Sequence, residues 1–345
     1  MRTGAASPPW TRLRDEQLLD LRLCDLRLQL RGSDVAARIT RLYGELAARG
    51  IHFRPHAWLA EEWFSPDGVP GFAVPFYLAH PRLTRLERKM TGDVEGSNRN
   101  WQMRILRHEA GHAIDSAYRL RRRARWRALF GPASQRYGAQ YRARPVSRRH
   151  VQHLGEWYAQ AHPTEDFAET FAVWLQPHSD WRRRYVGWPA LAKLEYVDAV
   201  VSELGVHRPP VHGRERIEAL EDNTRTLREH YLIKQRAQRR RHRARADAAL
   251  RRVFGPAPTD TPVVRAAGAA TLLRAHKPAL RRVLEREAGA DRYAAQQLLR
   301  LAIERCERLG LVARGSRRAL LPRLRAALVR MARGYLASDQ LRLRL

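Results

Sequence analysis

The stretch WQMRILRHEAGHAIDSAYRL occupies residues 101–120 of this 345-residue chain. It contains HEAGH, an instance of the pattern HExxH, whose two histidines are His108 and His112. Residues four apart lie on one face of a helix, so both imidazoles can bind one ion, while Glu109 can reach a water molecule on that ion. The pattern therefore predicts a helix with a zinc site for hydrolysis without a covalent intermediate.

The surroundings of the pattern favour a buried helix, which we expect to extend over about residues 101–127. Gly111 stands between the two histidines. Glycine within a helix costs about 1 kcal/mol relative to alanine, which makes sense where backbone or substrate must approach closely. The alternative is a buried helix with two hydrogen-bonded histidines and no metal. The flanking apolar residues are Ile105, Leu106, Ala113 and Ile114.

A catalytic zinc needs a third protein ligand and keeps its fourth position for water. Metzincins would have glycine at position 115 and histidine at 118. This chain has Asp115 and Tyr118 instead, which excludes that class. What remains is a carboxylate farther along the chain. The segment HPTEDFAETFA at 162–172 offers candidates, in a predicted helix with Thr164 as its N-cap.

Two carboxylates of that segment lie on one helix face. Glu165 and Glu169 are four residues apart, so one can bind zinc while the other accepts the N–H of a ligating imidazole and selects its tautomer. Acidic residues near a helix start also have an ordinary explanation, because they interact favourably with the helix dipole. Beside HExxH, we favour the metal-binding interpretation.

At these two blocks the sequence resembles a known family. Residues 101–120 and WYAQAHPTEDFAETFAVWL, at 157–175, are similar to bacterial zinc-binding metallopeptidases and to the catalytic domain of anthrax lethal factor, a gluzincin. The resemblance to lethal factor covers only these blocks, whereas that to the bacterial family extends over about residues 50–205. It implies a zincin-like fold and a zinc-dependent peptidase.

The resemblance also implies roles for individual residues. His108 and His112 match the two imidazole ligands, and Glu165 matches the third ligand. Glu109 matches the general base that assists attack of zinc-bound water on the peptide bond. The implied cofactor is one zinc ion per chain, and the implied substrate is a peptide or protein. The choice between endo- and exopeptidase stays open, because the Arg-rich stretch between His112 and Glu165 departs from the thermolysin branch.

Three further residues have counterparts in the family. Glu169 matches a carboxylate behind the zinc ligands, and Tyr158, seven residues before Glu165, matches a tyrosine that stabilises the oxyanion. Asp115, three residues after the second histidine, also has a counterpart near the ligands. Without the resemblance, Tyr158 would be interpreted as a packing residue.

The whole chain predicts an α+β fold that is predominantly helical. FAVPFYLAHPRL at 72–83 predicts a strand, and Pro75 within it favours an exposed sheet edge, because proline cannot donate to the ladder. Such an edge could align an extended peptide substrate. The expected organisation is a disordered N-terminus at 1–10, a zincin-like domain at 11–253, a Pro-rich linker at 254–262 and an Arg-rich helical C-terminal region at 263–345.

The composition is strongly basic, with 65 Lys and Arg against 35 Asp and Glu and a formal net charge of +30. Residues 231–345 contain 28 basic and 8 acidic residues, and residues 119–149 contain 11 basic and no acidic ones. Fields of this kind attract phosphates, lipid surfaces or acidic proteins. A polyanionic partner of the Arg-rich regions is one interpretation, and ordinary solvated faces in an Arg-biased protein are the other.

Two classes of function stay open. The first is a zinc metallopeptidase. The alternative is a non-catalytic zinc-containing protein that binds nucleic acid or acidic partners through its cationic C-terminal region. Glu109 favours the first, because a structural zinc site needs no general base.

The expected location is the cytoplasm. The N-terminus has charges where a signal peptide needs apolar residues, and no apolar run is long enough to cross a bilayer. Cys24 and Cys306 are too few and too far apart for a disulfide framework, so both are expected to be thiols.

Overall fold

The computed structural model divides the chain into two compact units, residues 1–86 with 94–227 and residues 87–93 with 228–345. This division groups residues 228–253 with the C-terminal helices, whereas the sequence-based boundaries group them with the HExxH region; those boundaries stay a prediction. The described residues are 8–92, 94–138, 144, 147–155, 157–204, 207–256, 268–313 and 315–339. Residues 1–7 of the predicted N-terminus and 257–262 of the predicted linker lie outside them.

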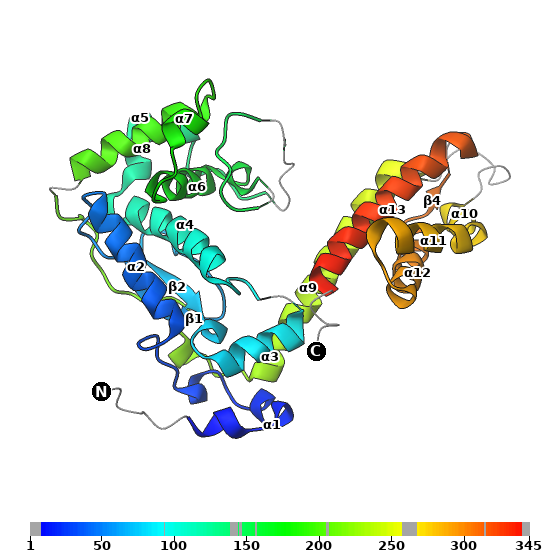
Figure 1. The fold of residues 1–345 in the computed structure, drawn as a ribbon, viewed down its shortest axis with the longest axis horizontal. Coiled ribbons are helices and arrows are strands. Elements are labelled where there is room, and N and C mark those ends of the chain that lie inside the picture. The colour runs from blue at the N-terminus through cyan, green and yellow to red at the C-terminus, as the bar shows by residue number, and fades with distance from the viewer. Residues whose placement is uncertain are drawn as a thin grey trace. The chain divides into compact units, whose positions relative to one another are not determined.

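The first unit is built mainly from helices with one small sheet (Figure 1). Its α-helices are α1 (Asp15–Leu19), α2 (Asp34–Ala48), α3 (Pro81–Thr91, ending in the second unit), α4 (Arg99–Tyr118), α5 (Ala124–Phe130), α6 (Pro163–Leu175), α7 (Trp181–Arg184) and α8 (Ala190–Leu204). Short 3-10 helices are η1 (Pro9–Arg12), η2 (Cys24–Leu26), η3 (Phe76–Leu78), η4 (Leu120–Arg122), η5 (Tyr158–Gln160) and η6 (Leu220–Asp222). The predominantly helical α+β class is confirmed at this level.

Helix α4 carries the HExxH pattern. The Asn98 side chain caps its first turn by accepting a hydrogen bond from the Trp101 N–H at 2.9 Å. Most of the helix is buried, because α6 packs on it as well as α2 and strand β2. It ends at Tyr118, where Arg119 adopts a left-handed backbone with φ 52°. The prediction of a helix to about residue 127 is therefore wrong, since this turn separates α4 from α5.

Helix α6 carries the two candidate carboxylates and is buried along its whole length. Its N-cap is His162 and not Thr164, which corrects the sequence-based prediction. The His162 Nδ1 accepts the N–H of Thr164 at 3.2 Å. Pro163 fills the first helical position, where a missing N–H costs nothing.

Helices α4 and α6 lie side by side (Figure 1) and approach each other closely at Gly111. A Cβ atom at position 111 would lie 2.9 Å from the Cα and 3.2 Å from the carbonyl oxygen of Ala168. Such contacts are shorter than side chains tolerate, so glycine is the residue that permits this approach. The expectation of a close backbone neighbour at Gly111 is confirmed.

The sheet of the first unit consists of two parallel strands, β1 (His56–Ala60) and β2 (Gly71–Pro75). The chain leaves β2 at its proline and enters η3, so the strand predicted over 72–83 is too long. All five residues of β2 are buried, and the Ala73 N–H donates to the Phe64 carbonyl at 2.8 Å on the side away from β1. In this two-stranded sheet β2 is an edge strand, as Pro75 predicted. Its outer side is not open along its whole length, because Phe64 pairs with it at Ala73.

The second unit has its own core of leucine, alanine and other apolar side chains. Its elements are the long helix α9 (Leu227–Val253), α10 (Ala269–Ala275), α11 (Lys277–Ala288), α12 (Arg292–Arg308) and α13 (Arg317–Asp339), with the short strands β3 (Gly255–Pro256) and β4 (Leu311–Val312) paired antiparallel. The predicted helical C-terminal region is helical here. Over the described residues, no helix combines the length and apolarity that a bilayer crossing requires.

The close approach of α4 and α6 leads to a prediction about stability. We expect Gly111→Ala to lower the free energy of unfolding by about 1–3 kcal/mol, because the added methyl group overpacks the helix contact. This loss should exceed the gain in helix propensity that alanine brings. Urea unfolding followed by circular dichroism measures the change.

Gly44→Ala in α2 is the matched control. Gly44 is also helical, but nothing lies within 4 Å of a Cβ built on it. This substitution should stabilise the protein by up to about 1 kcal/mol. Equal effects of the two substitutions would show that packing against α6 is not what Gly111 serves.

Candidate metal centre

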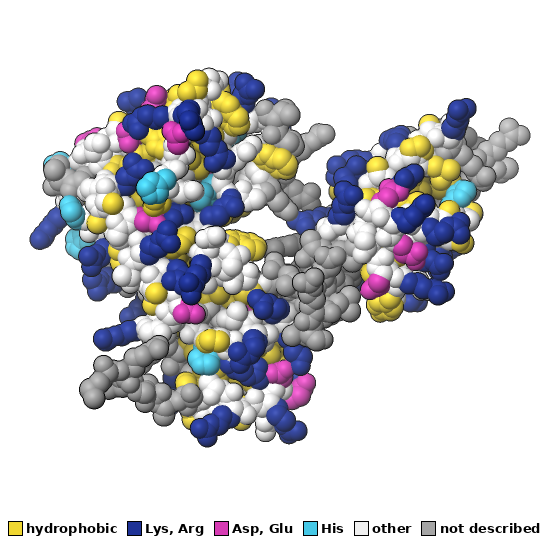
Figure 2. All heavy atoms as spheres, viewed as in Figure 1, with side chains coloured by type: hydrophobic (Ala, Val, Ile, Leu, Met, Phe, Trp, Pro, Cys, Tyr) yellow, Lys and Arg dark blue, Asp and Glu magenta, His cyan; other side chains and the backbone are white. Residues whose placement is uncertain are grey.

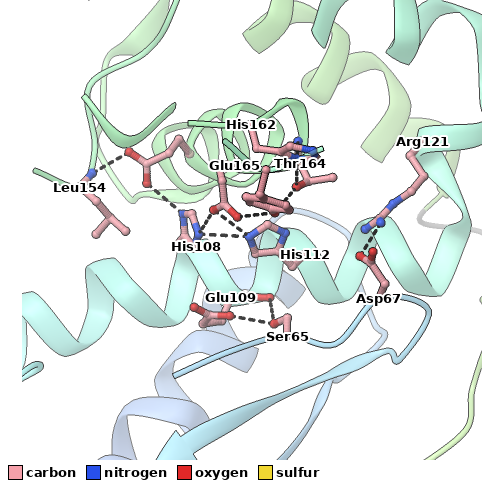
Figure 3. A network of polar contacts seen from close by, with 12 residues as sticks. Ser65, Asp67, His108, Glu109, His112, Arg121, Leu154, His162, Thr164 and Glu165 are labelled. Atoms are coloured by element: carbon pink, nitrogen blue, oxygen red, sulfur yellow. Dashed lines mark hydrogen bonds and ion pairs between the residues drawn. The ribbon is translucent and has the colours of Figure 1, made fainter. Parts of the chain in front are cut away.

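Three donor atoms meet between α4 and α6 (Figure 3). The Nε2 atoms of His108 and His112 lie 3.1 Å apart, and Oε2 of Glu165 lies 3.1 Å from the first and 3.2 Å from the second. Within the part of the chain that the structure describes, this is the one group of three His, Cys, Asp or Glu side chains placed to hold a metal ion. The predicted ligands His108, His112 and Glu165 are thus brought together.

The donor set fits zinc. Two imidazole nitrogens and one carboxylate oxygen, with a position left for water, form the ligand set of catalytic zinc sites. Nitrogen and oxygen ligands bonded to a tetrahedral zinc ion lie about 3.3 Å apart, close to the separations of these three atoms. His108 and Glu165 are buried, and the convergence of such groups without a compensating ion is costly.

Glu169 orients the first histidine. Its Oε1 accepts the Nδ1–H of His108 at 2.9 Å, and its Oε2 accepts the Leu154 N–H at 2.8 Å. The Nδ1–H tautomer leaves Nε2 to face Glu165. Glu169 is completely buried, so its position is set by these two hydrogen bonds.

The protonation of the site reflects this arrangement. Burial lowers the pKa of His108, but the hydrogen-bonded carboxylates of Glu165 and Glu169 raise it by more. The pKa of His108 is therefore raised to about 10. Burial raises the pKa of Glu165, and the two histidines more than offset this, so its pKa lies well below the usual range. A cation bound by these residues would compete with a proton for Nε2 of His108.

Glu109 lies next to the donor atoms in the chain and has a partner that the sequence did not reveal. The Ser65 hydroxyl donates to Oε2 of Glu109 at 2.8 Å (Figure 3). Glu109 is buried, so this hydrogen bond restricts its carboxylate. Among the described residues, Oε1 of Glu109 has no hydrogen-bond donor, which leaves one oxygen available to accept a proton.

Two tyrosines lie beside the donor atoms. The Tyr158 ring lies 5.7 Å from the His108 ring, between centroids, as the sequence led us to expect of a residue near the site. The Tyr137 hydroxyl donates to Oε1 of Glu165 at 2.8 Å and lies 2.8 Å from the Thr164 hydroxyl. Burial and the neighbouring Glu165 raise the pKa of both phenols, so both stay protonated.

The segment that carries Tyr137 is attached to the start of α6. Its ring stacks on His162 with a centroid distance of 3.9 Å and an interplanar angle of 11°. The His162 Nε2–H donates to the Gln135 carbonyl at 2.7 Å. The helix cap thus also positions a tyrosine on the Glu165 carboxylate.

Asp115 has a different environment. It is fully buried and accepts hydrogen bonds from the backbone N–H of Arg121 at 2.8 Å and from its Nε at 2.7 Å. Arg121 also pairs with Asp67. Burial raises the pKa of Asp115, and Arg121 partly offsets this. These contacts close the turn after α4, so they point to a structural part for Asp115.

The histidines His150, His153 and His162 do not form a second metal site. His153 donates to the Arg104 carbonyl at 3.0 Å, and His162 caps α6. The nearest carboxylate to His150 is that of Asp166, at 3.8 Å. His153 and His162 are therefore held by hydrogen bonds within the protein.

Sequence reasoning missed Ser65 and Tyr137. Neither stands in a recognisable spacing with HExxH, since they lie 44 residues before Glu109 and 28 residues before Glu165. The one available signal was composition, because Tyr137 lies within a Pro- and Arg-containing connection at about 131–149 that precedes Glu165. Their roles depend on how two connecting segments fold back onto α4 and α6.

Comparison with known proteins agrees with the site. Residues 102–182 match the model of a family described as "Putative zinc-binding metallo-peptidase". The matched range contains the three donor residues and Glu109. Comparisons with curated proteins and with solved structures gave no significant match, so the similarity to lethal factor rests on the two sequence blocks alone. At the level of the family, the match supports a zinc-binding metallopeptidase.

The contact between Tyr137 and Glu165 leads to a prediction about metal affinity. We expect Tyr137→Phe to weaken zinc binding about tenfold, at the lower end of the effect of removing a partner of a metal ligand, because Tyr137 is 61% exposed. Competition with a chromophoric chelator measures the affinity. Tyr293→Phe, at an exposed tyrosine in the second unit, should leave the affinity unchanged. An unchanged affinity in Tyr137→Phe would contradict this role.

Proposed function

We propose that this chain is a zinc-dependent metallopeptidase with a zincin-like fold of the gluzincin type. The observation that carries the proposal is the convergence of His108, His112 and Glu165 beside Glu109 in a buried site. The family match over residues 102–182 supports the same class. Whether the enzyme is an endo- or exopeptidase depends on features of the substrate site beyond these residues.

The three ligands would hold one zinc ion per chain. When bound, zinc would supply Lewis acidity that activates water and polarises the scissile carbonyl. Glu169 would keep the His108 imidazole in the tautomer that binds metal, and Tyr137 would hold the free oxygen of Glu165. Asp115 would stabilise the end of α4 through Arg121.

Glu109 and Tyr158 would carry out the proton transfer and charge stabilisation. Glu109 would accept a proton from the attacking water at Oε1, the oxygen that Ser65 leaves free, and pass it to the leaving amine. Tyr158 stays protonated and lies beside His108. Its hydroxyl is therefore suited to donate to the developing oxyanion. No covalent bond between protein and substrate is needed.

The first experiment measures metal content. Elemental mass spectrometry of protein purified without a metal-binding tag should find about one zinc ion per chain. Glu165→Ala should lose most of it, because two imidazoles alone hold zinc weakly. Glu203→Ala, at an exposed carboxylate paired with Arg123, is the control and should keep the metal. Zinc absent from wild type, or fully retained in Glu165→Ala, would exclude the gluzincin site.

The second experiment separates catalysis from metal binding. Glu109→Gln should reduce peptide hydrolysis by at least about a hundredfold, and Tyr158→Phe should lower kcat by a factor of about 100. Both variants should keep their zinc, because neither residue is a ligand. A peptide library screened with wild type and Glu109→Gln measures this.

The outcome also decides between the two classes of function. Hydrolysis at the wild-type rate in Glu109→Gln would exclude Glu109 as the general base. Zinc without hydrolysis of any peptide would instead favour the non-catalytic protein that binds nucleic acid or acidic partners through its cationic C-terminal region.

A further inference from the structure

A cavity of about 500 Å³ lies in the first unit, lined by residues of α2, α4 and α7, the end of α6 and the segment around His153. It does not contain the three metal-binding residues, Glu109 or either site tyrosine. Its volume is in the range of small-molecule sites in proteins. The arginines in its lining are Arg41, Arg104, Arg107 and Arg184.

The charge of this cavity is strongly positive. Its lining contains no Asp or Glu. Arg107 is neutralised by Glu45, with Nε 2.7 Å and Nη2 2.8 Å from its carboxylate, and Arg41 shares the same carboxylate at 3.1 Å. Four arginines against one glutamate leave three positive charges uncompensated.

Two of these arginines are free to bind a ligand. Among the described residues, the side chains of Arg104 and Arg184 have neither a hydrogen bond nor an ion pair, and both residues are exposed. The Arg184 guanidinium lies over the Tyr185 ring, 5.4 Å from its centroid. Other arginines on the surface of this unit, such as Arg123, Arg182 and Arg183, do have acidic partners. Within the described part of the chain, Arg104 and Arg184 thus offer two unpaired guanidinium groups in one cavity that has no acidic residue in its lining.

The remaining lining is suited to an organic group. Met103, Val173 and Pro177 provide apolar surface, and Gln152 provides an amide. Burial lowers the pKa of His153 to about 4, so this imidazole adds no positive charge near pH 7, whereas the guanidinium groups stay charged. Guanidinium groups bind phosphate oxygens in pairs and keep their charge.

We propose that this cavity is a binding site for a small organic phosphate. The phosphate dianion binds Arg104 and Arg184, and the organic part packs on Met103, Val173 and Pro177. The charge excess exceeds what a single carboxylate or sulfate ester neutralises, which favours a phosphate group.

The site is separate from the metal centre but close to it along the chain. His153 lines the cavity, and the next residue, Leu154, donates its N–H to Glu169, which in turn holds His108. Helix α4 likewise contributes Arg104 and Arg107 to the cavity just before His108. A ligand here would thus contact the segment that supports the metal ligands, without contacting the ligands themselves.

Isothermal titration calorimetry of the full chain with phenyl phosphate tests the proposal. We expect about one phenyl phosphate per chain, and at least about tenfold weaker binding in the double variant Arg104→Gln/Arg184→Gln. The control Arg99→Gln/Arg183→Gln removes the same charge from the same two helices, at residues that do not line the cavity. It should bind as wild type does. Because the four arginines are exposed, neither double variant should unfold.

Three results would overturn the proposal. The first is no binding to wild type. The second is equal weakening in both double variants, because this would show only an effect of the general basic field. The third is equally tight binding of phenyl sulfate, which has the same shape as phenyl phosphate but one negative charge. The titration is repeated on Glu165→Ala. Binding should persist there, since the cavity does not depend on the metal, whereas its loss would place phenyl phosphate at the metal centre. A failure of the proposed peptidase function would leave the expected binding intact.

Discussion

The contact between α4 and α6 at Gly111 is the constraint on which the candidate centre depends. The backbone of Ala168 lies where a side chain at 111 would be, so the two helix axes come close enough for short side chains to meet. His108 and His112 on α4 then reach Glu165 and Glu169 on α6 within hydrogen-bond distance. A larger separation of the two helices would move these donor atoms apart.

The same contact concentrates ionisable groups in the protein interior. Glu109, Asp115, Glu165, Asp166 and Glu169 are all buried, and buried carboxylates are costly unless each has a partner. Most of them are compensated locally: Arg121 pairs with Asp115, Lys193 with Asp166, and the Ser65 hydroxyl bonds Glu109. Glu165 and Glu169 have no Lys or Arg partner among the described residues; they contact the imidazoles and accept hydrogen bonds from the Tyr137 hydroxyl and the Leu154 N–H. Several ionisable groups buried at one place, at a cost in stability, are typical of binding and catalytic sites.

The arginines of this chain serve several purposes that composition alone cannot separate. Lys and Arg side chains are spread over the face seen in Figure 2, with far fewer acidic ones between them. Some arginines are structural: Arg107 is buried against Glu45, and in the second unit Arg305 forms two hydrogen bonds with Asp247. Others, such as Arg104, have no partner among the described residues. Some arginines therefore stabilise the fold through acidic partners, whereas others remain available to attract anions.

The sequence by itself determined the HExxH helix, the carboxylate helix that follows it and the helical character of the C-terminal region, because these follow from local periodicity. It also predicted that His108, His112 and Glu165 form one site, because residue types at a fixed spacing indicate a particular chemistry. It placed the end of α4 too late, chose Thr164 instead of His162 as the N-cap and expected an exposed edge at β2, whose outer side is partly covered because Phe64 pairs with Ala73. Only the tertiary structure decided that Ser65 bonds Glu109, that Tyr137 bonds Glu165, and that four arginines surround one cavity. These contacts join residues far apart in the chain, and their partners are selected by the packing of helices and loops, which no local pattern encodes.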